Sequence, residues 1–350
     1  MPNAIELQES AIEAPYVIKI ETIPLAKRLA LILVFCLAAF QLAAQTPSNS
    51  TSEPEVDLGE LSFGTRNEAQ WKRMRTVAET EDGEFLMVNL MKFRARAKYA
   101  DGRETNLTGE QANALYSPIK FIGQIGGGIE YVGRVNDQIG NLNPRWDEVG
   151  IVRYPSRAKF FEMLDDPEFE KRAVHKDAGL EVSQVLVTER VPWKLSGSKR
   201  IADQDDAFIY AQLLKYRKSV REATENDANK TRAGQASMEA FDAATETLLQ
   251  SLGAKPLLKT RVKGTLIGDG RSWDEFRMLQ FPSVAAYETY SDSLQKMPDA
   301  VKLKEAAIEE SYVIMIETMP LAKRLALSMA VSAFAPQEEG DKKNKKTEGP

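Results

Sequence analysis

The chain has 350 residues, with 46 basic and 51 acidic side chains, a formal net charge of −5 and 43% hydrophobic residues. This composition excludes disordered, collagen-like and strongly nucleic-acid-binding proteins, because it offers enough apolar side chains for a core and no cationic excess to attract phosphates. A single Cys and a single His exclude an internal disulfide and a zinc site of the usual nitrogen and sulfur ligands, so no metal or other cofactor is expected.

An export signal is the first functional segment that the pattern predicts. Residues 29–40 read LALILVFCLAAF, follow Lys27 and Arg28, and precede a stretch of small and polar residues. This order is typical of a secretory signal peptide, and the run is shorter than the roughly 20 apolar residues of a membrane span. We therefore predict a signal peptide at 25–45 and a periplasmic or extracellular protein that meets a membrane only through this segment. The alternative is a buried core helix.

The residues before this segment repeat the end of the chain. Residues 4–30 align without gaps on residues 300–326, with 19 of 27 positions identical. Our hypothesis is that residues 1–24 are a partial duplicate of a C-terminal helix and strand, which N-terminal sequencing of the secreted product would test. We predict a linker with a short helix at residues 46–80, and a C-terminal helix with a charged tail at residues 321–350.

A second repeat lies inside the predicted mature region. FLMVNLMKFR matches FIYAQLLKYR, WDEVGIVRYPSRAKF matches WDEFRMLQFPSVAAY, and HKDAGLEVSQVLVTE matches LKEAAIEESYVIMIE. The blocks lie at 85–94, 146–160 and 175–189 in the first half, and at 208–217, 273–287 and 303–317 in the second. Equal order and nearly equal spacing indicate two copies of one domain. We predict them at 81–195 and 206–320.

Each copy reads as β-α-β-β-α-β, with Gly126 to Gly128 ending the first helix of the first copy and Ser156 capping its second helix. The strand at 85–94 is apolar on both faces, whereas an antiparallel sheet with helices on one side usually leaves the other face polar. We therefore predict an α+β fold in which two ferredoxin-like repeats pack sheet to sheet as an intrachain dimeric α/β barrel. Such a chain is a monomer with an internal pseudodimer, or forms a further homodimer.

The motifs of the first copy carry a family resemblance. NLMKFR, YADGRE, GGGIEYVGRV, WDEVGIVRYPSRAKFFEMLDDPEFEKRAVHKDAGLE and VLVTE resemble the dimeric alpha/beta barrel superfamily, most closely its branch called domain of unknown function 1330. The resemblance covers residues 85 to 190 closely and the second copy only in outline. It implies a fold similar to antibiotic-biosynthesis monooxygenases, muconolactone isomerases and haem-handling barrels, with a ligand cavity between paired sheets. It implies no particular reaction, because one fold hosts many chemistries.

His175 is the candidate catalytic residue. It is the only imidazole, and it stands where the resembled family usually has a His. It could act as a general base or a haem ligand, since its ordinary pKa is near neutrality. The alternative is a helix residue that is solvated or hydrogen-bonded. Its counterpart in the second copy is Leu303, which excludes two symmetric sites that both need His.

Asn89 and Gln212 occupy equivalent places in the two first strands. If their strand faces line the cavity between the sheets, two amides and two phenols would contact a ligand held by apolar surface. The alternative is that the amides satisfy one another or nearby backbone in a dry interface. The candidate ligand-binding residues are Asn89, Met87, Met91, Phe93, Tyr210, Gln212, Tyr216 and Arg134, the last able to orient an anion.

The repeated Trp-Asp-Glu triplets at 146–148 and 273–275 have both a functional and a structural interpretation. Their carboxylates could act in a site, but each triplet begins a strand beside a loop. In the structural interpretation, the Trp covers the barrel end and the Asp caps the turn.

We therefore expect an exported protein that binds a small molecule in a cavity between two ferredoxin-like sheets. One alternative is a cofactor-poor monooxygenase or isomerase, with His175 as base and Asn89 holding an oxyanion. The others are a haem-binding barrel and a structural module whose cavity is filled by side chains. No nucleic-acid partner is expected.

Overall fold

The computed structural model describes residues 58–195, 207–218 and 233–317. Within these ranges, no helix is both long and apolar enough to cross a membrane. Three predicted segments lie outside the described residues: the duplicate at 1–24, the signal peptide at 25–45 and the C-terminal segment at 321–350.

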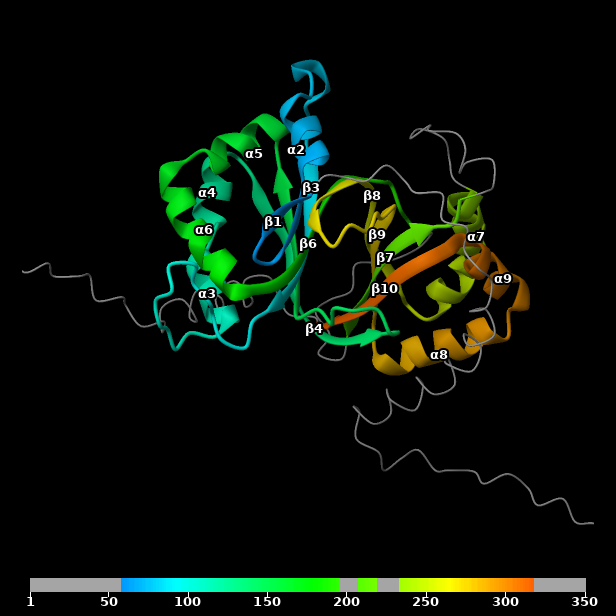
Figure 1. Cartoon of the computed structure of the whole chain (residues 1–350). Coiled ribbons are helices and arrows are strands. Elements are labelled where there is room, and N and C mark those ends of the chain that lie inside the picture. Colours follow the sequence, from blue (N-terminus) through cyan, green and yellow to red (C-terminus); the bar gives the residue numbers. More distant parts are fainter. Residues whose placement is uncertain (1–57, 196–206, 219–232, 318–350) are drawn as a thin grey trace, which may run out of the picture. The chain divides into compact units, whose positions relative to one another are not determined.

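The first unit, from β3 to β6, has the predicted β-α-β-β-α-β order, with both helical regions divided in two. Its strands form an antiparallel sheet in the order β6-β3-β5-β4. Figure 1 shows α5 and α6, in green, on one side of β3 and β6. The elements are β3 (Phe85–Phe93), α3 (Gly109–Tyr116), α4 (Ile119–Gln124), β4 (Gly128–Ile139), β5 (Glu148–Tyr154), α5 (Arg157–Leu164), α6 (Pro167–Gly179) and β6 (Leu180–Arg190).

Local side-chain chemistry sets where the helices of this unit begin. Thr108 and Gln111 form a capping box at α3, and the predicted cap Ser156 accepts a hydrogen bond from the Lys159 backbone N–H at 3.1 Å. Asp166 caps α6, whose first residue is Pro167. Each cap satisfies a backbone donor that the first helical turn leaves without an intrahelical partner.

The second unit, from β7 to β10, repeats the arrangement with the strand order β10-β7-β9-β8. A short segment before β3 adds two strands and a helix, and its β2 pairs with β8. The second unit consists of β7 (Phe208–Tyr216), α7 (Ala233–Ser251), β8 (Lys255–Gly268), β9 (Glu275–Phe281), α8 (Val284–Gln295), α9 (Pro298–Ala307) and β10 (Ile308–Glu317); the short segment consists of β1 (Leu58–Leu61), β2 (Gly64–Asn67) and α2 (Glu68–Arg75).

The two sheets close into one barrel. β6 pairs with β8, with Val185 opposite Ile267, and β4 pairs with β10, with Ile139 opposite Val313. The last strand of each unit therefore pairs with the second strand of the other, so apart from β1 and β2 the strands form a closed ring. The predicted fold class is confirmed: two ferredoxin-like units form a dimeric α/β barrel within one chain.

Side chains from both units fill the barrel interior. Leu86, Val88 and Leu90 of β3 belong to one buried cluster with residues of β7, β9 and β10. Trp146 and Trp273 both pack against Tyr312 in this cluster, with ring centroids 5.6 and 5.4 Å apart. A ring of eight strands leaves just enough room for interdigitated side chains, so the space between the sheets is a packed core.

The placement of Asn89 corrects one expectation. We expected the face with Asn89, Met87 and Met91 to line the space between the sheets, but this face lies against the helices. Strand alternation separates two faces without deciding which one is enclosed. The face of Leu86, Val88 and Leu90 enters the barrel, where it packs against apolar side chains of the second sheet.

Candidate functional site

A cavity of about 290 Å³ lies between the outer face of the first sheet and the helices of the first unit. Strands β3, β4 and β5 form its floor, and residues of α3, α4, α5 and α6 form its walls. Trp71 of α2 and two residues of β8, Leu266 and Ile267, also border it. The cavity therefore belongs mainly to the first unit, and the second unit contributes the two β8 residues and Glu317 of β10.

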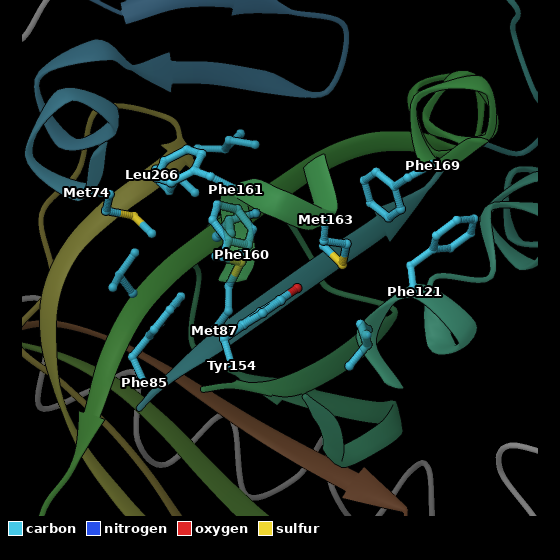
Figure 2. Packing of buried hydrophobic residues seen from close by; sticks show 14 of the residues in the cluster. Met74, Phe85, Met87, Phe121, Tyr154, Phe160, Phe161, Met163, Phe169 and Leu266 are labelled. Atoms are coloured by element: carbon cyan, nitrogen blue, oxygen red, sulfur yellow. The ribbon is translucent and has the colours of Figure 1, made fainter. Parts of the chain in front are cut away.

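The walls of the cavity are mostly aromatic and aliphatic. Figure 2 shows Met87 and Tyr154 of the sheet beneath Phe160 and Met163 of α5. Tyr154 packs edge-on against Phe160, with ring centroids 5.1 Å apart. Burial raises the pKa of the Tyr154 phenol, and burial also raises that of Tyr116, so both rings stay neutral. Such walls suit an apolar ligand.

Asn89 is one of the polar groups at this cavity. Its amide Nδ2 donates long hydrogen bonds to the backbone oxygens of Met87, at 3.3 Å, and Gly150, at 3.4 Å. Only 9% of the residue is exposed. Because these bonds are at the weak end of the usual range, the amide can exchange them for contacts with a ligand.

Glu148 is one of three glutamates that line the cavity, together with Glu110 and Glu317. The neighbouring Asp147 holds the start of β5, since its Oδ2 accepts a hydrogen bond from the Phe93 backbone N–H at 2.7 Å. Glu148 has no side-chain hydrogen bond or ion pair within the described part of the chain. Burial, together with the nearby Glu110 carboxylate, raises its pKa from 4.5 to about 7, although Arg134 opposes the shift. Glu148 can therefore exchange a proton near neutrality.

Lys176 of α6 is the amine of the cavity. Its Nζ lies 5.4 Å from the centre of the Tyr116 ring and 5.8 Å from that of Phe63. Removal from water lowers its pKa from 10.5 to about 8. The cavity thus holds an acid and a base that both titrate close to physiological pH.

Arg134 is an exposed residue of the cavity lining. Its Nη2 is 2.5 Å from Glu110 Oε1, and its side chain is 60% exposed. The guanidinium is therefore already paired, which weakens the expectation that it orients an anion. Asn89, Met87, Met91 and Phe93 line the same cavity as Arg134, so the structure brings these predicted residues together.

His175 lies outside the set of residues that line the cavity. Its Nδ1 is 2.7 Å from the Tyr99 hydroxyl, and the two rings meet edge to face with centroids 5.6 Å apart. Tyr99 belongs to the segment between β3 and α3. Lys176, which follows His175 in the chain, does line the cavity. The structure thus does not bring His175 together with Asn89. In the described ranges, no group of three or more His, Cys, Asp or Glu side chains could hold a metal ion.

Tyr210, Gln212 and Tyr216 lie on the corresponding outer face of the second sheet, away from the cavity. All three are buried. Tyr210 packs against Tyr287, at 5.4 Å between centroids, and the Tyr216 hydroxyl donates to Glu275 at 2.7 Å. Side chains therefore fill this place in the second unit.

The interpretation of the sequence missed Glu148 and Lys176 as site residues. Glu148 was visible in the repeated Trp-Asp-Glu triplet, but the adjacent Asp147 and Trp146 have the structural roles given above. Lys176 was not selected, because a lysine in a helix gives no sequence signal for a site, whereas the neighbouring His175 is the only imidazole. The aligned blocks WDEVG and WDEFR contain a signal for the cavity, because Gly150 in the first copy aligns with Arg277 in the second. The missing side chain at Gly150 leaves space beside Glu148.

Comparisons with known proteins add the following likenesses. No protein-family model and no curated protein matches the sequence. The chain is similar to the methylated RPA0582 protein, at 32% identity over 35% of this chain and 91% of that one, with a TM-score of 0.32; RPA0582 is a protein of unknown function from Rhodopseudomonas palustris. It is also similar to an anthrone oxidase-like protein, at 12% identity over 69% and 94% of the chains, with a TM-score of 0.45. A mutant chlorite dismutase from Candidatus Nitrospira defluvii matches at 11% identity over 73% and 98%, with a TM-score of 0.41.

Proposed function

We propose that the protein binds a small, largely apolar molecule in the cavity of its first unit. The cavity itself is the observation that carries this proposal: about 290 Å³ of space between mostly aromatic and aliphatic walls, with Asn89, Glu148 and Lys176 among the polar groups. A few polar groups in an otherwise apolar concave site are the usual composition of a small-molecule pocket.

The proposal includes export and family membership. The apolar run at 29–40 after two basic residues supports an exported, periplasmic or extracellular protein. The motifs of the first copy support its assignment to domain of unknown function 1330. The closed barrel supports a monomer with an internal pseudodimer, because each sheet already covers the other.

A neutral fluorescent probe tests the binding function. N-phenyl-1-naphthylamine brightens in apolar surroundings, and we expect one molecule to bind per chain. In the alignment of the two copies, Met163 corresponds to Tyr290 and Gly150 corresponds to Arg277. Replacing each cavity residue by its larger counterpart, in Met163→Tyr and Gly150→Arg, should fill the cavity and weaken probe binding about tenfold or more. Gly123→Ala is the control, because a Cβ there meets no atom within 4 Å and the residue does not line the cavity.

Two results would contradict this function. One is that the probe fails to bind the unaltered protein. The other is that both filled variants keep their circular dichroism spectrum and bind the probe as well as the unaltered protein does.

A proton-transfer enzyme of the isomerase type is the second candidate. The observation that favours it is Glu148, whose pKa of about 7 suits a general acid or base at neutral pH. In this candidate Glu148, rather than His175, is the group placed to exchange a proton with a bound molecule. The candidate requires that Glu148 titrates near neutrality, which the pH dependence of unfolding described below measures.

A further inference from the structure

The two units place the same backbone frame around different side chains. In the first unit, Gly150 of β5 lies opposite Asn89 on one side and Val132 on the other. In the second unit, Arg277 of β9 lies opposite Gln212 and Lys259. The register therefore makes Gly150 equivalent to Arg277, and Val132 equivalent to Lys259. Likewise Glu148 is equivalent to Glu275, since they pair with Met91 and Leu214.

In the second unit, these positions hold a buried charge network. The Arg277 side chain is only 3% exposed; its Nε donates to Glu275, and its Nη1 lies 2.6 Å from Asp242 Oδ1. Lys259 Nζ lies 3.1 Å from Asp242 and 3.6 Å from Glu275. Trp193 covers both cations, with its ring centre 5.1 Å from the Arg277 guanidinium and 5.8 Å from Lys259 Nζ. Two cations thus balance two carboxylates inside the fold.

In the first unit, the equivalent carboxylate, Glu148, is present, but the side chains that pair with Glu275 in the second unit are replaced. Gly150 and Val132 replace the two cations, and Phe93 replaces Tyr216, whose hydroxyl donates to Glu275. Ser117 replaces Asp242, because each lies eight residues after the glycine whose N–H donates to the end of the first strand. Glu148 therefore faces the cavity without a cationic hydrogen-bond partner in the described residues.

The other charged residues around the cavity do not supply a cationic hydrogen-bond partner for Glu148. Arg134 is paired with Glu110, and Asp147 accepts from backbone beside Glu148. Lys176 Nζ lies over the Tyr116 and Phe63 rings, and removal from water lowers its pKa, so it is not a ready ion-pair partner for Glu148. Glu317 of β10 adds another acidic residue to the lining. A buried carboxylate gains most from a cation that donates hydrogen bonds directly to it.

We propose, building on the binding function above, that the natural ligand carries a guanidinium, amidinium or primary ammonium group, which lies over Gly150 and donates to Glu148. This group takes the place that the Arg277 guanidinium has in the second unit. The apolar remainder of the ligand extends toward Met87, Tyr154 and Phe160. The second unit thus contains, as its own side chain, the kind of group that the first unit receives from outside.

Three isosteric probes test the charge preference: benzamidine, benzamide and benzoate, which are cationic, neutral and anionic. Calorimetric titration at about pH 8.5 keeps Glu148 ionised and Lys176 largely neutral, given pKa values of about 7 and about 8. We expect benzamidine to bind about tenfold or more tightly than either of the other two. Glu148→Gln should remove this preference by weakening benzamidine binding to the level of benzamide binding in the same variant, and Gly150→Arg should abolish benzamidine binding by supplying the guanidinium internally.

The outcomes separate this inference from the binding function. If benzamide binds as tightly as benzamidine, or if the preference survives in Glu148→Gln, the cationic ligand is wrong and the cavity still binds small molecules. If benzoate binds tightest, Lys176 or Arg134 is the anchor and the inference is overturned. If neither the three probes nor N-phenyl-1-naphthylamine bind, the binding function itself fails.

Discussion

Glu148 and Glu275 show how much the surroundings of one residue decide its chemistry. Both begin the third strand of their unit and follow an Asp that accepts from the backbone of the first strand at 2.7 Å. Glu275 meets Arg277, Lys259 and the Tyr216 hydroxyl, which together hold it as a structural carboxylate. Glu148 meets a cavity. The same residue type is therefore part of the core in one unit and a candidate functional group in the other.

The pH dependence of unfolding should report the state of Glu148. Its pKa is about 7 in the fold against an ordinary 4.5, so the folded state binds more protons than the unfolded state between these values. The contribution to stability is full below pH 4.5 and is lost as pH rises through 7, by about 3 kcal/mol at most. Glu148→Gln should match the unaltered protein near pH 5 and exceed its free energy of unfolding by about 2 kcal/mol near pH 8.

Urea unfolding at both pH values measures this difference. Lys176 and the other titrating groups are common to the two proteins, so their contributions largely cancel in the comparison. An equal free-energy difference at both pH values would show that Glu148 titrates at its ordinary value, which would also remove the proton-transfer candidate.

At the scale of elements, one close approach in each unit joins the sheet to two helices. The Arg94 N–H donates to Gly179 at the end of α6, and its carbonyl accepts from Gly109 at the start of α3, at 2.9 and 3.0 Å. Arg217, Ala307 and Gly234 make the same pair of bonds, at 2.9 and 3.0 Å, in the second unit. This connection sets how closely α3 and α6 lie to each other, and so it positions Glu110 and Lys176 at the cavity.

Gly109→Ala should therefore destabilise the protein. A Cβ at Gly109 would overlap the backbone oxygens of Gly179 and Arg94, which cannot move aside as a flexible side chain could. We expect a loss of about 1 to 3 kcal/mol in the free energy of unfolding. The control Gly123→Ala, at an exposed position of α4 with open space around it, should lose nothing and gain up to about 1 kcal/mol. Equal urea midpoints for the two variants would contradict the close approach.

At the scale of the whole molecule, the barrel makes the two units depend on each other. Its interior cluster takes side chains from both sheets, and the β6–β8 and β4–β10 pairings close the ring. Neither sheet could leave the other without exposing this apolar face to water. The asymmetry between the units lies outside the barrel, where one helical layer encloses a cavity and the other encloses a charge network.

We accordingly expect the described fold to unfold in a single cooperative transition. Far-ultraviolet circular dichroism and tryptophan fluorescence should give coincident urea curves, because secondary structure and packing are lost together. Gly109→Ala alters only the first unit, yet it should shift both curves by the same amount. Two resolved transitions, of which the variant moves only one, would show that the units unfold independently.

Much of this architecture follows from local features of the sequence. The repeated blocks predicted two units, and alternation, glycines and the Ser156 cap predicted the order of the strands and helices, because each depends on residues close together in the chain. The apolar character of both faces of β3 predicted that the sheets cover each other. Seven of the predicted binding residues lie on the first strands of the two units, and four of these, with Arg134, meet at one cavity.

The location and chemistry of the site needed the tertiary structure. Alternation assigned Asn89 and Leu86 to opposite faces of β3, but only the closed ring decided that Leu86 would face the interior, because there its side chain packs against apolar residues of the second sheet. The difference between Gly150 and Arg277 is visible in the sequence, as one aligned position that is Gly in the first copy and Arg in the second. Its meaning depends on register across β5 and β9, which places the missing guanidinium beside the carboxylate that remains.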